Sequence, residues 1–216
     1  MTSGVKLFLV ITMDKQPKRR SSRPRSFDRA EAVETAMRLF RRHGYEGVSV
    51  ANLTKAIGIA PPSLYAAFGS KAGLYREALD RYAELPGALD GMRDTATLEE
   101  AITGLLEAAA RAVTAEESGC MISTGLIEAG TEHEYLCQEL AARRKRLEKG
   151  IALGLERWVA PQEAARLAAF LFAVQQGMSV QARDGASLEA LLLIARDAVA
   201  GIVARRAMES QNRSQP

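Results

Sequence analysis

The polar residues that could do chemistry in this chain are suited to holding phosphate groups. Tyr65 and Lys71 place a hydroxyl and an ammonium in a single short stretch, SVANLTKAIGIAPPSLYAAFGSK. Such groups are common partners of nucleic-acid phosphates, which they bind without reading the base sequence. The stretch is therefore predicted to form a phosphate-binding surface.

Groups suited to breaking bonds are not evident in the sequence. The chain has 2 histidines and 2 cysteines, and no HExxH, GxSxG or P-loop pattern occurs in it. Cys120 and Cys137 do not form a CxxC pair, so we expect reduced thiols in a cytoplasmic protein. No apolar run approaches the ~20 residues that a membrane-spanning helix needs. We expect no enzymatic activity, no cofactor, no metal site and no membrane partner.

Two short helices joined by a tight turn must position the phosphate-binding residues. Leu53, Ile57 and Leu64 can pack the two helices together, and Gly58 lies where the chain must turn. This spacing is typical of a helix-turn-helix, whose second helix enters the DNA major groove. An ordinary αα-hairpin in an all-helical domain fits the spacing equally well.

The second helix has features that favour the DNA-binding interpretation. Pro61–Pro62 open it, where the missing N–H groups cost least. Leu64 and Phe68 are four residues apart and point inward together. Ser63 and Tyr65 then lie off the inward face, where they are predicted to be accessible to DNA.

A family resemblance covers this region. The run GYEGVSVANLTKAIGIAPPSLYAAFGSKAGLYREAL, with matching residues from about Phe27 to Leu79, resembles the N-terminal domain of the tetracycline-repressor (TetR/AcrR) family of bacterial transcription regulators. The resemblance implies a homodimeric, all-α, ligand-responsive DNA-binding protein, and we expect a repressor that leaves a palindromic operator when a small-molecule effector binds. In this family the helix that corresponds to Lys71–Leu85 transmits effector binding to the DNA-binding domains.

Residues in the matched motif are expected to contact DNA. Phosphate positioning is assigned to Ser49, Tyr65 and Lys71, and base readout to Asn52, Lys55 and Ser63, with Pro61 against a thymine methyl group. Alanines and prolines occupy places where many relatives carry polar or basic side chains. DNA shape is therefore expected to contribute to sequence preference.

Charge is unevenly distributed along the chain. Residues 1–90 hold 15 lysines and arginines against 9 aspartates and glutamates, a net charge of +6, whereas residues 91–216 have a net charge of −3. Residues 1–25 are predicted to be a disordered basic arm. Either the arm is a solubilising tail, or it lies along DNA through Arg19, Arg20, Arg23 and Arg25.

The remaining segments predict an all-α chain of about nine helices. After the arm, residues 26–71 form the helix-turn-helix domain, residues 72–206 an effector-binding and dimerisation bundle, and residues 207–216 a polar tail. The expected helices are Asp28–His43, Val50–Ile57, one opening at Pro61, Lys71–Leu85, Leu98–Ala115, one beginning near Gly119, a charged helix through Leu136 and Leu155, Pro161–Ala182 and Leu188–Arg205.

The last two predicted helices are apolar on more than one face, so they need burial on more than one side. We expect them to form a symmetric four-helix interface with a second copy, although packing within a monomer core is an alternative. The residues assigned to this interface are Leu171, Phe172, Gln176, Gly177, Val180, Leu191, Leu192, Ala195 and Val199.

The effector pocket is expected inside the C-terminal bundle. Candidate lining residues are Met121, Leu126, Trp158, Phe170 and Gln175, each of which could instead be ordinary core. Some relatives with a Gly-Cys sequence respond to oxidants, so Cys120 is either a thiol sensor or a packing residue. Two other functions remain open: a helical small-molecule-binding or interaction protein with a lapsed DNA reader, and a sequence-indifferent DNA binder.

Overall fold

A computed structural model of the chain describes residues 27–115, 119–123, 125 and 133–213. Within these ranges the chain forms eight α-helices and one 3-10 helix, with no strand, which confirms the predicted all-α class. The elements are α1 (Arg29–His43), α2 (Val50–Ile57), α3 (Pro61–Phe68), α4 (Lys71–Ala83), η1 (Ala88–Met92), α5 (Leu98–Thr114), α6 (Glu134–Leu155), α7 (Pro161–Arg183) and α8 (Leu188–Arg213).

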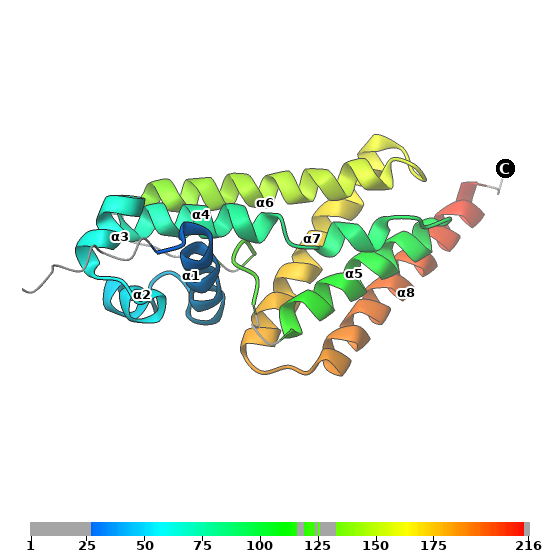
Figure 1. Ribbon diagram of the computed structural model, residues 1–216. Helices are drawn as coiled ribbons and strands as arrows, with labels where there is room; N and C mark the ends of the chain where they lie inside the picture. The colour runs from blue at the N-terminus through cyan, green and yellow to red at the C-terminus, as the bar shows by residue number, and fades with distance from the viewer. Residues whose placement is uncertain (1–26, 116–118, 124, 126–132, 214–216) are drawn as a thin grey trace, which may run out of the picture.

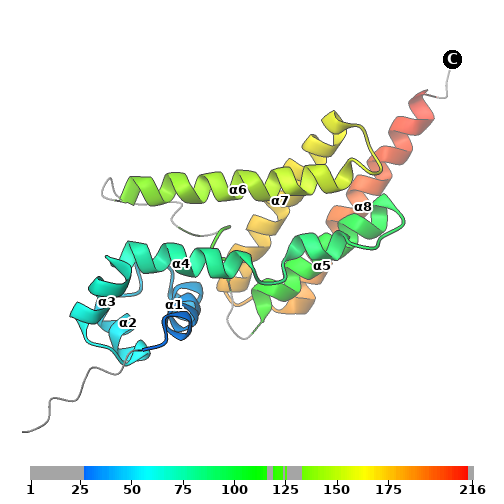
Figure 2. The same cartoon turned by 45° about the horizontal axis from the view of Figure 1, so that its top comes forward.

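The molecule is elongated, with its first and last helices at opposite ends (Figures 1 and 2). Helices α1–α4 gather at one end, and α5, α7 and α8 lie at the other. Helix α6 runs beside α4 and reaches α7, so it connects the two ends. The fold thus places a small helical unit at the tip of a larger bundle.

An aromatic cluster holds the N-terminal unit together. The ring of Tyr75, on α4, meets Phe40 edge-on with 4.9 Å between centroids and lies 5.0 Å from Tyr45. All three side chains are buried, and large aromatic rings contribute much of the burial energy of small cores. The first half of α4 therefore packs with α1 as part of the N-terminal unit.

Two ion pairs, one helical turn apart, join α4 to α6. Arg76 pairs with Glu139 at 2.9 Å, and one turn further Asp80 pairs with Arg143 at 2.6 Å. The partners advance together along both helices, so α4 and α6 run in the same direction. Any movement of α4 must break these pairs or carry α6 with it.

The bundle core depends on a close backbone contact between η1 and α5. A Cβ atom at Gly91 would lie 2.1 Å from the carbonyl oxygen of Gly104, and one at Gly104 would lie 2.0 Å from that of Gly91. No side chain fits in such a gap. Both positions need glycine for the 3-10 turn to rest on α5, with Met92 buried beyond it.

A helix was predicted to begin near Gly119, and here the structure differs. Gly119 lies in a bend, and Met121, Ile122, Ser123 and Gly125 lie in turns, while residues 124 and 126–132 are outside the described ranges. The guanidinium of Arg144, on α6, donates hydrogen bonds to the carbonyls of Ile122 and Gly125, both at 3.1 Å. A long-range side chain therefore stabilises these turns, which local periodicity does not reveal.

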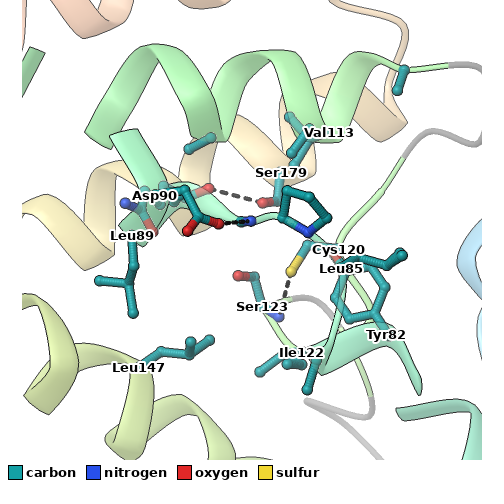
Figure 3. A pocket seen from close by; sticks show the side chains of 18 of the residues that line it. Tyr82, Leu85, Leu89, Asp90, Val113, Cys120, Ile122, Ser123, Leu147 and Ser179 are labelled. Carbon is teal, nitrogen blue, oxygen red and sulfur yellow. Dashed lines mark hydrogen bonds between the residues drawn. The ribbon is translucent and has the colours of Figure 1, made fainter. Parts of the chain in front are cut away.

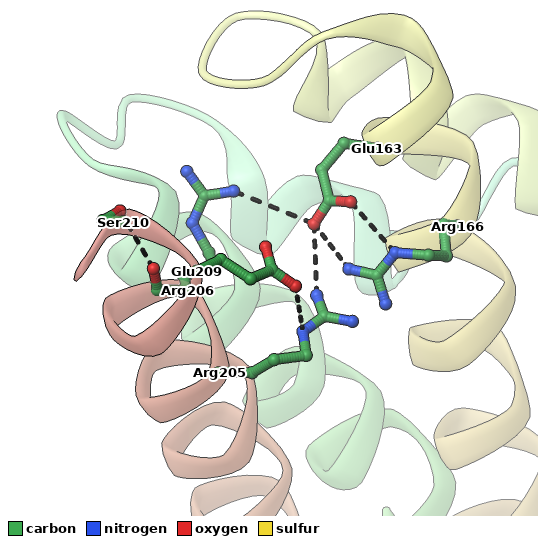
Figure 4. Close-up of polar contacts among 6 residues, drawn as sticks. All are labelled: Glu163, Arg166, Arg205, Arg206, Glu209 and Ser210. Carbon is green, nitrogen blue, oxygen red and sulfur yellow. Dashed lines mark hydrogen bonds and ion pairs between the residues drawn. The ribbon is translucent and has the colours of Figure 1, made fainter. Parts of the chain in front are cut away.

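Helix α8 continues to Arg213, beyond its predicted end at Arg205 and into the predicted polar tail. Figure 4 shows why the extra turns are stable. Glu163, in the first turn of α7, accepts from Arg205 at 3.1 Å and pairs with Arg206 at 3.9 Å, and Arg205 also lies 3.6 Å from Glu209. Arg166 completes the cluster by donating to Glu163. Helix α4, by contrast, ends at Ala83, two residues before its predicted end.

Candidate nucleic-acid interface and effector cavity

Helices α2 and α3 form the predicted helix-turn-helix. Gly58 ends α2 in the left-handed conformation, with φ 78° and ψ 30°, and its N–H bonds to the carbonyl of Thr54. Ala60 is extended, as expected for a residue before proline, and α3 begins at Pro61. The three-residue turn therefore follows from a glycine that tolerates positive φ and a proline that prevents one continuous helix.

Helix α3 is anchored by one face and exposed on the other. Leu64 is fully buried and Phe68 is 7% exposed, whereas Tyr65 is 49% exposed. Pro61 and Pro62 are exposed as well. Helix α3 lies at the tip of the molecule (Figure 2), and these side chains are not covered by the other described residues.

Arg29 holds α3 in place, a role that its exposed position in α1 did not indicate. Its guanidinium donates to the carbonyl of Ala67, pairs with Glu77 on α4, and lies 4.5 Å from the ring centroid of Phe68. One side chain thus joins α1, α3 and α4. The partners are 38 and 48 residues away in sequence, so no local pattern could have found the contact.

Ser49 and Asn52 are brought together as a reciprocal cap at the start of α2. The Asn52 N–H donates to Ser49 Oγ at 3.1 Å, and Asn52 Oδ1 accepts from the Ser49 N–H at 2.9 Å. The Ser49 hydroxyl also donates to Asn52 Oδ1. The Asn52 amide nitrogen therefore remains the group of that side chain best placed to reach DNA.

Lys71 rests on an aromatic ring at the start of α4. Its ammonium lies 4.0 Å from the ring centroid of Tyr45, a cation–π arrangement that fixes the side chain. Partial burial lowers the pKa of Lys71, and the nearby carboxylate of Glu46 opposes that shift. The predicted phosphate ligand is thus held in one orientation before DNA arrives.

The other predicted DNA contacts differ in accessibility. Lys55 is exposed on α2, and Ser63 is half-buried on α3. Arg19, Arg20, Arg23 and Arg25 lie outside the described residues.

A cavity of about 510 Å³ lies where the two ends of the molecule meet. Figure 3 shows it from close by, with Tyr82, Cys120 and Ser179 among its lining residues. The walls come from α1, α4, η1, α5, the turns at 120–123, α6 and α7. Six of the nine described elements therefore line this space, and α2, α3 and α8 do not.

Of the five predicted pocket residues, Gln175 lines this cavity. Met121 is buried in the N-terminal core instead. The indole N–H of Trp158 donates to the carbonyl of Ala96 at 3.1 Å, and Phe170 is 46% exposed on α7. Leu126 lies outside the described residues. The apolar candidates were chosen on apolar character alone, which does not distinguish a pocket wall from a core, so their assignment to the effector pocket stays a prediction.

The charged groups of the cavity lining come from α1 and the η1 region. Arg41, in the last turn of α1, is 9% exposed, donates to the carbonyl of Ala112 on α5 at 3.3 Å and lies 5.3 Å from the ring centroid of Tyr82. Asp90 and Arg93 pair with each other at 3.0 Å. Helical periodicity assigns Arg41 to the solvent-facing side of α1, so sequence reasoning did not find its place in the cavity wall.

Cys120 lies in the cavity wall, half-buried. Its sulfur accepts from the N–H of Ser123 at 3.3 Å. Burial raises the pKa of Tyr82, and Cys120, which hydrogen-bonds to that hydroxyl, raises it further. The Tyr82 hydroxyl therefore stays protonated at neutral pH. Among the described residues no group of three or more His, Cys, Asp or Glu side chains could hold a metal ion.

The residues assigned to the dimer interface divide into two groups. Five are buried in the chain's own core, namely Leu171, Phe172, Leu191, Ala195 and Val199. Gly177 and Val180 are exposed, and Gln176 and Leu192 are half-buried. Periodicity identified apolar helices but not which of their faces the protomer itself already covers. Of the described helices, none is long and apolar enough to cross a membrane.

Comparison with known proteins finds relatives that are described as transcription regulators. A family model described as bacterial regulatory proteins, tetR family, matches residues 32–78. The HTH-type transcriptional repressor ComR of Escherichia coli (strain K12) is 34% identical over 189 residues, 82% of this chain and 90% of ComR. The HTH-type transcriptional repressor BdcR of the same strain is 34% identical over 199 residues, 90% of this chain and 98% of BdcR.

A solved structure is similar over nearly the whole chain. It is a cysteine mutant of the TetR family transcriptional regulator CifR complexed with 26bp double-strand operator DNA. It is 34% identical, has a TM-score of 0.75, and the match covers 90% of this chain and 100% of that one. With the helix-turn-helix, the all-α bundle and two full-length relatives in agreement, this chain belongs to the TetR family of bacterial transcription regulators.

Proposed function

We propose that this protein is a cytoplasmic repressor that binds a palindromic operator as a homodimer and leaves it when a small molecule enters the central cavity. The observation that supports it most strongly is the outward face of α3, where Tyr65 is 49% exposed while Leu64 behind it is fully buried. A helix held in this way can enter the major groove without disturbing its own core.

Dimerisation is supported by an exposed stripe on the last two helices. The α7–α8 stripe comprises Phe170, Ala173, Gly177 and Val180 on α7 and Leu193, Gly201 and Ala204 on α8, all exposed. A Cβ atom added at Gly177 or Gly201 would meet nothing within 4 Å. Small residues allow a second helix to approach closely, and a groove of about 280 Å³ lies between Phe170 and Gly201.

Symmetry sets the geometry that such a dimer must satisfy. Two copies of α3 reach successive major grooves when their centres are about 34–36 Å apart, one turn of DNA. Because α4 is fastened to both the N-terminal unit and α6, a ligand that displaces α4 changes this spacing. Repression would be relieved when the spacing no longer matches the half-sites.

Footprinting of the purified chain on the DNA upstream of its own gene tests the proposal. We expect protection of one palindrome that persists in the presence of competitor DNA. Uniform coverage that competitor DNA removes would support a sequence-indifferent binder instead. An absence of protection would support a helical small-molecule-binding protein whose helix-turn-helix no longer binds DNA.

A further inference from the structure

Gln175 lines the central cavity and carries a buried polar group. Its side chain is 8% exposed, and its amide nitrogen has no hydrogen-bond partner among the described residues. Such a buried donor is costly to leave unpaired, and native structures rarely do so without a reason. Because Nε2 itself has almost no accessible surface, the Gln175 amide must turn toward the cavity, where a ligand oxygen can accept from Nε2 and satisfy it.

The described part of the cavity lining is mainly apolar, and its net charge is positive. The apolar lining includes Leu85, Leu89, Val113, Leu147 and Ile151. Among the described lining residues, the charged ones are Arg41, Asp90 and Arg93, two cations against one anion. Since Asp90 pairs with Arg93, the excess positive charge is that of Arg41, which is itself nine-tenths buried.

We propose that the effector is an apolar monocarboxylate, with its carboxylate accepting from Gln175 Nε2 in the field of Arg41 and its ring or chain against the apolar wall. This inference rests on the proposed function, because it names the chemical class of molecule that occupies the effector cavity. A volume of about 510 Å³ is within the usual range of sites for small organic ligands.

Other ligand classes fit this lining less well. An organic cation would place its charge in the same field as Arg41 and offer Gln175 Nε2 no acceptor. An inorganic anion would leave the apolar wall without contacts. A neutral alcohol fits the wall and can accept a hydrogen bond, but it gains nothing from the guanidinium charge.

Calorimetric titration of the full-length protein with three probes of matched shape tests the proposal. The probes are naphthylacetate, naphthylethanol and naphthylethylamine, which differ in the polar group alone. We expect the carboxylate to bind about tenfold more tightly than the alcohol, as a charge-assisted hydrogen bond predicts, and the amine to bind most weakly. Failure of all three to bind, or equal binding of alcohol and carboxylate, overturns the proposal.

Variants on α7 assign the effect to one side chain. Gln175→Leu should weaken naphthylacetate binding about tenfold, whereas Gln162→Leu, an exposed glutamine on the same helix, should leave it unchanged. Gln175→Glu should abolish carboxylate binding and favour the amine, a reversal that loss of folding cannot produce. Unchanged binding in Gln175→Leu overturns the role of this residue.

Footprinting without probes keeps this result separate from the proposed function. If the palindrome is protected but no carboxylate binds, the ligand class is wrong and the repressor proposal stands. If a carboxylate binds at Gln175 but no DNA is protected, the DNA-binding function is wrong and the cavity assignment stands.

Discussion

At the scale of single residues, two side chains of the predicted phosphate-binding surface are held differently. Tyr65 is 49% exposed on α3, whereas the Lys71 ammonium is fixed over the ring of Tyr45. A side chain that is already ordered loses less entropy when it binds. Lys71 should therefore contribute more to DNA affinity than Tyr65.

We predict that Lys71→Ala weakens DNA binding about tenfold, and Tyr65→Phe by less, on operator and unrelated DNA alike. Lys71→Ala should also reduce the slope of log affinity against log salt by about 1, since one phosphate contact is lost. Fluorescence anisotropy at several salt concentrations measures both effects. Lys145→Ala, an exposed lysine on α6, is the matched control. A loss confined to one operator base pair would contradict the phosphate role.

The hydrogen-bond partners of Cys120 can also bond to a serine hydroxyl. If Cys120 is only a packing residue, Cys120→Ser should therefore have little effect. Its sulfur accepts from the Ser123 N–H and contacts the Tyr82 hydroxyl. We expect Cys120→Ser to leave effector-induced DNA release unchanged, as measured by anisotropy. Should Cys120→Ser abolish an oxidant-induced release that Cys137→Ser retains, the thiol is a sensor instead.

Residue spacing was sufficient to predict which side chains of α3 face outward, but not what each one touches. The i, i+4 pair Leu64 and Phe68 identified the buried face, and that prediction is confirmed. Residue spacing did not predict the contacts with distant partners. Arg29 contacts Glu77 and Ala67, and Arg41 contacts Ala112. Such contacts depend on how helices cross, which the sequence of one helix does not determine.

At the scale of elements, helix bounds were predictable where the stop signals were local. Pro61 and Gly58 limited α3 and α2 correctly, because each acts through its own backbone geometry. The predicted end of α8 was wrong, because the carboxylate of Glu163 on α7, 42 residues away in sequence, stabilises the last turns of α8. Tertiary contacts therefore set the bounds that local propensity leaves open.

The contact of η1 with α5 gives an element-scale prediction. Gly104→Ala places a methyl group 2.0 Å from the carbonyl oxygen of Gly91, so η1 must move away from α5. We expect a loss of about 1–3 kcal/mol in the free energy of unfolding, typical of overpacking, measured by denaturant titration. Gly87→Ala at the start of η1 should change it by less than about 0.5 kcal/mol, because the nearest atom there is 3.9 Å away. Equal losses in the two variants would mean that the close contact is not limiting.

At the scale of the whole molecule, DNA affinity should depend on the α7–α8 stripe although it lies far from α3. One bound half-site raises the local concentration of the second, so a dimer binds more tightly than its separate protomers. We predict that Val180→Glu yields a monomer by light scattering and weakens operator binding at least about tenfold. Leu153→Glu is a matched control, since Leu153 is 56% exposed on α6 and outside the stripe. A Val180→Glu protein that remains dimeric would place the interface elsewhere.

Arg41 offers a route by which the cavity can act on the DNA-binding end. It belongs to α1, yet its guanidinium reaches the cavity wall and bonds to the Ala112 carbonyl of α5. A bound carboxylate competes for that guanidinium and so loosens the link between the N-terminal unit and the bundle. A link of this kind typically corresponds to a coupling free energy of about 1–3 kcal/mol, or about 5–150-fold in DNA affinity.

In Arg41→Gln we therefore expect operator affinity to be nearly equal with and without saturating naphthylacetate, whereas wild type and Arg42→Gln should lose affinity when the probe is added. Anisotropy titrations with and without the probe measure this ratio, and a full response in Arg41→Gln would mean that α4 and α6 carry the signal without α1.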